Sequence, residues 1–440
     1  MKVFLNSADV IGASMAGPGI RYLEMAKALA TKHSITIAMP NNPELTDING
    51  INFLRFKGWG QIKNHDVIIT QFVVPDLLLA AKRFGVRIIV DAYDPVTLEN
   101  LETNSLASIQ KRTKFNEDFV LIQTFSLNSA DAIICASEKQ RDLWIGALST
   151  LGRITPELYD FDKSLRSFID VVPFGLPATS PRKTGIGPRE QFRLNSGDFV
   201  LLWGGGIWNW FDPLSLIEAV ASLQQKRTDI KLVFMSVKHP SESFPDMEMA
   251  KAATDLAEHL GVKDSSVFFN YNWVPYAQRA NYLLDADVGV STHFNHLETS
   301  FSFRTRILDY IWAGLPIIST QGDSFAELIL QKNLGVVVDF ENTKSIATAI
   351  EFLADDKERY KFIKGNLANI KNQYQWENIT QVLEGLLQTD FITPPKKIYS
   401  MVAGYYVDKA RILAREDGIL ALIKKIYLVA LLRAKPLVSK

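Results

Sequence analysis

The amino-acid sequence predicts an α/β protein made of two doubly wound domains that face each other across a cleft. Three observations support this prediction. The chain has 440 residues, which is more than one hydrophobic core usually organises. Short β-branched runs alternate with helical patterns through its first half, and the alternation starts again after a polar segment. Because such strands pair in parallel through right-handed crossovers, their carboxyl ends should meet at the cleft, where ligands bind.

The first domain is expected over residues 1–177. Its strands are predicted at Val3–Leu5, Ser34–Ala38, Asp66–Thr70, Val86–Val90 and Ala132–Cys135. Its helices are predicted at Ile20–Ala30, Asp76–Phe84 and Glu138–Ala147. The loop Gly12–Gly19, before the first helix, contains three glycines. Two readings stay open there: Gly19 lets a ligand approach the backbone at a helix N-terminus, or the loop is simply a tight turn.

A linker is predicted at residues 178–198, where Pro, Gly, Ser, Arg and Lys dominate. The second domain is expected over residues 199–375. Its strands are predicted at Phe199–Trp203, Leu232–Ser236, Val267–Phe269, Asp287–Ser291, Pro316–Ser319 and Gly335–Val338. Its helices are predicted at Leu214–Gln225, Met247–Leu260, Tyr276–Ala286, Phe303–Ala313, Phe325–Gln331 and Thr343–Leu353. Both halves therefore predict Rossmann-like domains of similar architecture.

The composition excludes several classes of protein. The net charge is zero, but residues 391–440 carry ten Lys or Arg against three Asp or Glu, so the tail is basic and the body is acidic. A nucleic-acid partner is not expected, because such a protein would normally show a basic domain. The single cysteine, Cys135, excludes an internal disulfide. No export signal and no apolar run of about 18 residues is visible, so a cytoplasmic protein is expected.

One stretch, His296–Thr320, carries the strongest indication of a ligand site. Its helix should begin near Ser302 or Phe303 and end at Gly314, because glycine accepts a left-handed cap and a proline follows two residues later. The free N–H groups at the start of that helix, together with Arg304 and Arg306, would suit a diphosphate. Further polar candidates at this start are Glu298, Ser300 and Ser302.

Two segments of the second domain add candidate donor-binding residues. Gly204, Gly205 and Gly206 follow its first predicted strand directly, which indicates that bare backbone lies close to a ligand or to packed side chains. Asp212 is read more simply as a helix N-cap before Pro213. Lys238 follows the next strand and could hold phosphate, although a solvated lysine beside a turn is an equal reading.

Carboxylates follow a strand of the first domain. Asp91 and Asp94 should face the cleft, where they could accept a proton from an acceptor hydroxyl or orient it, but Asp94 also stands before a proline, as in an ordinary turn. A metal site at His293, His296 and Glu298 is the weaker reading, because their spacing does not place them on one face of an element. No metal is therefore expected.

Several segments in order resemble the GT-B glycosyltransferases, and most of all their large retaining family 4. They are the glycine loop before Ile20 and residues 130–138 (ADAIICASE), 171–176 (VVPFGL), 282–290 (YLLDADVGV) and 313–316 (AGLP). Residues 374–377 (YQWE) resemble the closing helix of the family, which implies that residues 376–390 cross back to the first domain. The resemblance implies a nucleotide-sugar donor held by the second domain, an acceptor from the first, retained anomeric configuration and no required metal.

The chain departs from the family signature at several residues. The second of two signature glutamates, which binds the ribose hydroxyls in the family, falls on Asp309 and stays a carboxylate. The first, which contacts the donor sugar, falls on Phe301, and Glu298 is the nearest substitute. The Arg and Lys that normally follow the first strand of this domain are missing, which leaves Arg304, Arg306 and Lys238 for the diphosphate.

These departures keep two classes of function open. One is an active transferase working in surface polysaccharide or glycoconjugate assembly, and the other is a silent relative that binds a nucleotide sugar or a partner protein. An epimerase of the same fold is a third reading. Residues 391–440 form an extension in which residues 410–435 mix apolar and basic side chains. They fit an anionic membrane surface, with a lipid-linked acceptor, or else pack on the body or a second subunit.

Overall fold

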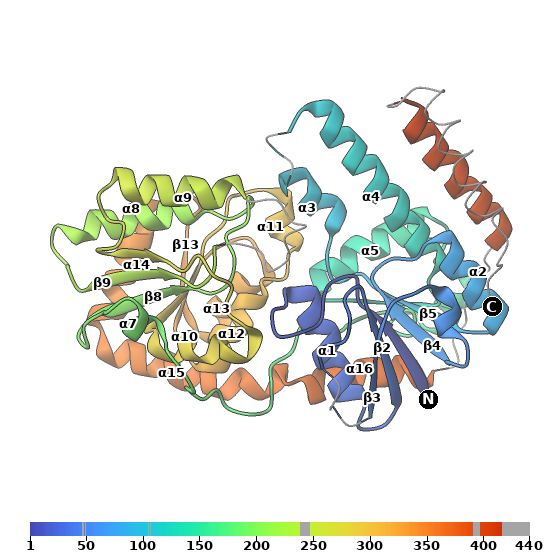
Figure 1. The fold of residues 1–440 in the computed structure, drawn as a ribbon, viewed down its shortest axis with the longest axis horizontal. Coiled ribbons are helices and arrows are strands. Elements are labelled where there is room, and N and C mark those ends of the chain that lie inside the picture. The colour runs from blue at the N-terminus through green and yellow to red at the C-terminus, as the bar shows by residue number, and fades with distance from the viewer. Residues whose placement is uncertain are drawn as a thin grey trace.

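The protein is described by a computed structural model that covers residues 1–45, 48, 50–103, 105, 107–237, 247–389 and 397–415. Its strands form two sheets, of seven and six strands, in which neighbouring strands pair in parallel. Figure 1 shows two lobes, each built from one sheet with helices packed around it. The prediction of two doubly wound domains is therefore confirmed.

The first sheet has the strand order β3-β2-β1-β4-β5-β6-β7. Its strands are β1 (Lys2–Asn6), β2 (Ser34–Met39), β3 (Ile51–Arg55), β4 (Val67–Thr70), β5 (Arg87–Asp91), β6 (Ala132–Cys135) and β7 (Ile169–Val171). β4 and β6 are buried at every position, which is typical of parallel strands covered on both faces. The two unpredicted strands, β3 and β7, lie at the sheet edges and are only partly buried, so they lack a continuous apolar run.

Helices surround this sheet. They are α1 (Gly17–Leu29), α2 (Pro75–Phe84), α3 (Val96–Thr103), α4 (Ile109–Ser129), α5 (Glu138–Thr150) and α6 (Pro156–Phe161). α1 begins three residues before the predicted start at Ile20, because Pro18 lies in its first turn and its fixed φ suits that position. α3 and α4 were not predicted. Both are largely half-exposed, so they show little of the apolar periodicity that marks a helix packed on a core.

The second sheet has the strand order β10-β9-β8-β11-β12-β13. Its strands are β8 (Phe199–Trp203), β9 (Ile230–Phe234), β10 (Val267–Phe269), β11 (Val288–Ser291), β12 (Ile317–Thr320) and β13 (Gly335–Val338). Its helices are α8 (Pro213–Gln224), α9 (Glu248–His259), α10 (Arg279–Asp285), α11 (Leu297–Phe301), α12 (Thr305–Ala313), α13 (Ser324–Lys332), α14 (Thr343–Asp355) and α15 (Lys357–Ile370). A short helix, α7 (Pro188–Gln191), lies within the predicted linker.

The segment before α12 differs from its prediction. The residues just before the predicted helix start form a separate short helix, α11, which His296 caps by accepting a hydrogen bond from the Thr299 backbone N–H at 3.2 Å. α12 then begins at Thr305 rather than at Phe303. Its end is as predicted, because Gly314 adopts the left-handed conformation with φ of 69°.

The chain returns to the first domain after α15. The backbone N–H of Leu176 donates to Tyr374 and that of Trp376 donates to Leu176, so the outgoing and returning segments are joined. α16 (Trp376–Gln388) follows and packs beside α1, under the first sheet in Figure 1. His33 Nε2 and the Glu384 carboxylate are hydrogen-bonded at 2.9 Å beside this contact.

The described part of the extension is a helix over residues 398–415 that packs on the first domain, beside α4 in Figure 1. Lys409 and Arg415 form ion pairs with Asp118 and Glu117 of α4. Of the stretch predicted to meet a membrane, residues 410–415 therefore pack on the body, and residues 416–435 lie outside the described residues. No helix in the described ranges combines the length and the apolar content that crossing a bilayer requires.

Candidate active site

A cavity of about 160 Å³ lies between the two domains, at the carboxyl ends of strands from both sheets. The first domain contributes the loop before α1, from Met15 to Gly17, and Phe174 after β7. The second domain contributes the glycine turn after β8, the segment before α10, and one face of α12. This is the edge at which the doubly wound topology predicted a ligand site.

The glycine turn after β8 combines two structural reasons for glycine. Gly205 has φ of 100°, a conformation that L side chains rarely adopt, and it lines the cavity with open space where a side chain would stand. At Gly206, an added Cβ would lie 2.8 Å from the ring of Trp208. The packing reading therefore holds for Gly206, while Gly205 presents bare backbone to the cavity.

Asp309 lies on the face of α12 that lines the cavity. Its carboxylate accepts a hydrogen bond from Arg279 Nε at 3.0 Å, and 31% of its side chain remains exposed. The helix is held in place because Tyr310, the next residue, is buried and its hydroxyl donates to backbone carbonyls of β8 and β11. A carboxylate is thus presented to the cavity from a fixed helix.

Arg306 is the cation of this helix that lines the cavity. Its guanidinium lies over the rings of Trp203 and Phe211, and Nη2 donates to the Gly206 carbonyl at 3.0 Å. Nη1 is buried and has no hydrogen-bond partner among the residues that the structure describes. Burial lowers the pKa of Arg306 to about 10, so the group stays charged at neutral pH. A charged N–H donor is therefore available beside the cavity.

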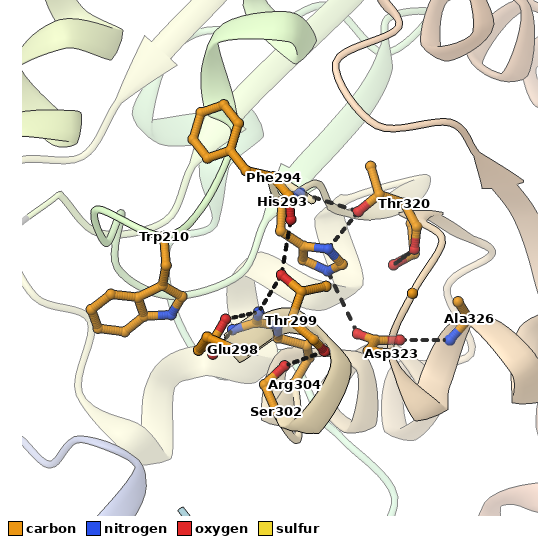
Figure 2. A network of polar contacts seen from close by, with 12 residues as sticks. Trp210, His293, Phe294, Glu298, Thr299, Ser302, Arg304, Thr320, Asp323 and Ala326 are labelled. Carbon is orange, nitrogen blue, oxygen red and sulfur yellow. Dashed lines mark hydrogen bonds and ion pairs between the residues drawn. The ribbon is translucent and has the colours of Figure 1, made fainter. Parts of the chain in front are cut away.

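Arg304, which was predicted to bind the donor, is not among the residues that line this cavity. Figure 2 shows its guanidinium facing Glu298, and both side chains are buried. Nη1 and Nη2 donate to the two Glu298 oxygens at 2.9 and 2.6 Å. Glu298, predicted as catalytic, is thus engaged by Arg304, and this pair holds α11 against the start of α12.

The neighbouring predicted residues also lie away from the cavity lining. Ser302 donates to the Thr299 carbonyl, and Ser300 is a half-buried residue of α11. Phe303 stacks on Phe174 of the first domain at 6.4 Å between ring centroids, so it packs the domain interface. A Cβ on Gly19 would lie 2.3 Å from the Val10 carbonyl, which favours the tight-turn reading of that loop.

Asp91 is fully buried in an ion pair with Arg21 of α1, which corrects its expected place facing the cleft. Arg21 Nε and Nη2 donate to its two oxygens at 2.7 and 2.8 Å. The same guanidinium donates to the Val172 and Pro173 carbonyls after β7. Asp91 therefore fixes the carboxyl edge of the first sheet and has no free face for a substrate.

Asp94 lies at the domain interface rather than in the cavity lining, where α3 meets α11. Burial raises the pKa of Asp94, and the nearby Glu298 carboxylate adds to that shift. Burial, and then the charge of Asp94, raises the pKa of Glu99 well above its ordinary value, and a hydrogen bond joins the two carboxyl groups. Arg304 donates hydrogen bonds to Glu298, and its positive charge also acts on Asp94 and Glu99 in the direction that lowers their pKa values.

A buried polar network continues behind this interface (Figure 2). His293 Nδ1 lies 2.5 Å from the Thr320 hydroxyl, and its Nε2 lies 3.5 Å from Asp323. Burial lowers the pKa of His293 well below its ordinary value, and burial raises the pKa of Asp323 to about 6. Among the described residues, no three His, Cys, Asp or Glu side chains are grouped so that they could hold a metal ion.

Sequence reasoning missed Trp273 and Tyr276, which line the cavity ahead of α10, and Arg279, which lines it from the first position of α10. Tyr276 also links the domains, because its backbone N–H donates to the Ala13 carbonyl at 3.3 Å. No motif marks these residues, although an arginine and two aromatic residues within seven positions is a combination suited to a planar ligand. Lys238 lies outside the described residues. Asp212 caps α8 by accepting from the Ser215 N–H, as predicted.

Comparisons with known proteins bear on the second domain and on the fold. Residues 189–368 match the family model "Glycosyl transferases group 1". The chain is 24% identical over 225 residues to lipopolysaccharide 1,2-N-acetylglucosaminetransferase of Salmonella typhimurium, which covers 51% of this chain and 57% of the relative. It is 27% identical over 205 residues to a D-inositol 3-phosphate glycosyltransferase of an Arthrobacter species, over 45% and 43% of the two chains. The alignments thus span about half the length of these curated relatives.

Solved structures share the arrangement of both domains. Anabaena HepE in complex with UDP-glucose superposes with a TM-score of 0.63 at 15% identity, over 88% of this chain and all of the other. The resemblance to GT-B glycosyltransferases predicted from the sequence is confirmed. The chain has the GT-B fold of two facing parallel sheets, and its second domain matches the group 1 glycosyltransferase family.

Proposed function

We propose that this protein is a retaining glycosyltransferase that moves a sugar from a nucleoside-diphosphate donor to an acceptor hydroxyl. One observation carries the proposal: Asp309, Arg306 and the bare backbone at Gly205 line the same cavity between the two domains. A carboxylate suits the two hydroxyls of a ribose, and a guanidinium suits a diphosphate. Glycine lets a bulky charged group approach the main chain closely.

In this scheme the second domain holds the donor. Asp309 accepts hydrogen bonds from the ribose hydroxyls, and Arg306 Nη1 donates to the diphosphate. The start of α12 at Thr305 lines the cavity as well and adds N–H groups and the positive end of a helix. The bond that breaks joins the anomeric carbon to the diphosphate oxygen, so these groups stabilise the charge that develops on the leaving group.

Because a guanidinium and a helix end meet this charge, the scheme requires no metal ion. Product formation should therefore be unchanged when EDTA is added in excess. A loss of turnover with EDTA that returns on adding Mg²⁺ or Mn²⁺ would contradict this part of the proposal. The EDTA experiment needs a donor and acceptor pair that turns over, so it is done after such a pair has been identified.

The size of the cavity indicates how the reaction is shielded from water. Small-molecule sites usually measure about 300–1,000 Å³, and this cavity holds about 160 Å³. The domains must therefore separate to admit the donor and then approach again. The closed contacts are the backbone bond from Tyr276 to Ala13 and the stack of Phe303 on Phe174. Closure would exclude water, which otherwise competes with the acceptor.

We further propose that the acceptor is a carbohydrate or a lipid-linked sugar in the assembly of a bacterial surface polysaccharide or glycoconjugate. The similarity to the lipopolysaccharide 1,2-N-acetylglucosaminetransferase of Salmonella typhimurium supports this acceptor class. The protein would act in the cytoplasm, at the inner face of the membrane. The basic residues of its extension beyond Arg415, within residues 416–435, would aid docking to anionic lipid. Flotation with anionic liposomes, compared between the full chain and a chain ending at Asp390, tests the docking.

The transferase proposal is tested by release of free nucleoside diphosphate. A thermal-shift screen of nucleoside diphosphates and their sugars first identifies the base, and turnover is then followed with candidate acceptors. Asp309→Asn should raise the donor KM and reduce turnover, whereas Asp339→Asn, an exposed control in the same domain, should change neither. Absence of binding by every nucleotide would overturn the proposal.

A second candidate function is a catalytically silent relative that binds a nucleotide sugar. It is favoured by one specific observation: Phe301 stands where the family has the glutamate for the donor sugar, and the nearest carboxylate, Glu298, is held by Arg304. Such a protein would bind nucleoside diphosphate but release none from any donor and acceptor pair. Binding together with turnover excludes this reading.

A further inference from the structure

Arg279 stands at the first position of α10 and is held rigidly beside the cavity. Its guanidinium lies 3.7 Å from the ring centroid of Tyr276 on one side and 4.4 Å from that of Trp312 on the other. Nη1 donates to the Tyr276 carbonyl at 2.8 Å, and only 8% of the side chain is exposed. Two aromatic rings and one backbone acceptor therefore fix the plane of this guanidinium.

The fixed guanidinium acts on one oxygen of Asp309. Nε donates to Asp309 Oδ1 at 3.0 Å, and the aspartate side chain remains 31% exposed where α12 lines the cavity. No other hydrogen bond to this carboxylate is found among the described residues. A short side chain that is anchored through one oxygen presents the other in a defined direction.

The electrostatics agree with this arrangement. Burial by itself would lower the pKa of Arg279, but the charge of Asp309 and the other partners of the guanidinium together more than offset burial, so the pKa of Arg279 is raised. Tyr276 and Glu24 of the first domain act in the same direction. Arg279 therefore remains charged and paired with Asp309.

We propose that Arg279 is a positioning residue that orients the Asp309 carboxylate toward the two ribose hydroxyls of the donor nucleotide. This inference rests on the proposed function. It adds that recognition of the ribose depends on the planar guanidinium between Tyr276 and Trp312, and not on the positive charge alone. A lysine could keep the charge, but it could neither stack between the rings nor hold its donor in one direction.

The test compares two ligands that differ only in the ribose hydroxyls. The dissociation constants of UDP and 2′,3′-dideoxy-UDP are measured by calorimetry, or those of the GDP or ADP pair if the screen selects another base. Hydrogen bonds to a charged group contribute enough that the wild-type protein should bind the hydroxyl-bearing ligand about tenfold or more tightly. Asp309→Ala should reduce this preference to about onefold, because the acceptor of the hydroxyls is gone.

Arg279→Lys and Arg279→Gln are the deciding variants. Both should reduce the preference to within about threefold while the affinity for the dideoxy ligand stays near the wild-type value. Adding Arg279→Lys to Asp309→Ala should change the preference no further. Arg189→Lys is the matched control, because Arg189 pairs with Asp287 in the same domain but does not line the cavity. It should keep the full preference.

The outcomes separate this inference from the proposed function. Nucleotide binding with a full hydroxyl preference in both Arg279 variants would overturn the positioning role and leave the transferase proposal standing. Failure of the wild-type protein to bind any nucleotide would overturn the transferase proposal itself. Melting curves are recorded for every variant, and loss of the fold in both Arg279 variants would assign Arg279 to folding and overturn the inference.

Discussion

Arg304 and Arg306, two residues apart at the start of α12, have guanidinium groups in different surroundings. Arg304 gives two hydrogen bonds to Glu298 inside the second domain, whereas Arg306 donates to the Gly206 carbonyl and lines the cavity. Arg304 is the N-cap of α12 and points to Glu298, and of the two arginines only Arg306 lines the cavity. Replacing Arg304 and replacing Arg306 should therefore have different effects.

Replacement of Arg306 should weaken diphosphate binding. Arg306→Ala removes the charged donor beside Gly206, and the affinity for the nucleoside diphosphate should fall about 10- to 100-fold. The affinity for the nucleoside without phosphates should stay unchanged. Calorimetry with both ligands checks the result, with Arg166→Ala, an exposed arginine of the first domain, as the control. An equal loss for both ligands would contradict the assignment.

Replacement of Arg304 should reduce stability instead. Arg304→Ala leaves the Glu298 carboxylate buried without its cation, which should lower the free energy of unfolding by about 3–5 kcal/mol. Arg304→Ala with Glu298→Leu removes both charges and should recover much of that loss. Urea unfolding of the two variants checks this. A stable Arg304→Ala protein that fails to bind nucleotide would return Arg304 to the ligand site.

Breaking the buried ion pair of Asp91 with Arg21 should also reduce stability. Asp91→Asn leaves Arg21 buried with only the Val172 and Pro173 carbonyls, and the loss of stability should again be about 3–5 kcal/mol. Turnover per folded molecule should stay near the wild-type value, because Asp91 has no surface facing the substrate. Abolished turnover in a well-folded variant would restore its catalytic assignment.

Asp323 should make stability depend on pH in a defined direction. Its pKa is raised from 3.8 to about 6 by burial, so folding favours the protonated form. The stabilisation is present below about pH 4 and is lost as the pH rises through 6, with a total on the order of 3 kcal/mol. Asp323→Asn should remove this dependence, because the amide side chain does not titrate. The helix should stay intact, because Asn still caps α13 through its side-chain oxygen. Urea unfolding of both proteins at pH 4 and pH 7 measures the difference.

More of the fold than of the candidate site could be predicted from the sequence. Alternating strands and helices predicted both sheets, because the buried parallel strands are apolar at nearly every position. The resemblance to the family signature singled out Asp309, and Asp309 lines the cavity from α12. The position of Arg279 could not be predicted, because it meets Asp309 through a contact between separate helices. In the same way, the pairing of Asp91 with Arg21 could not be predicted, because the two residues are 70 positions apart in the sequence.

The bonding of Leu176 to Tyr374 and Trp376 has a consequence for motion of the whole molecule. The polypeptide passes between the lobes twice, once outward and once on its return, and both passages are tied together at this one place. We therefore expect this place to act as the pivot between the lobes. It lies beside Phe174 and Gly175, which line the cavity. When the lobes swing apart, the mouth should widen most on the side away from this pivot, where α3 meets α11.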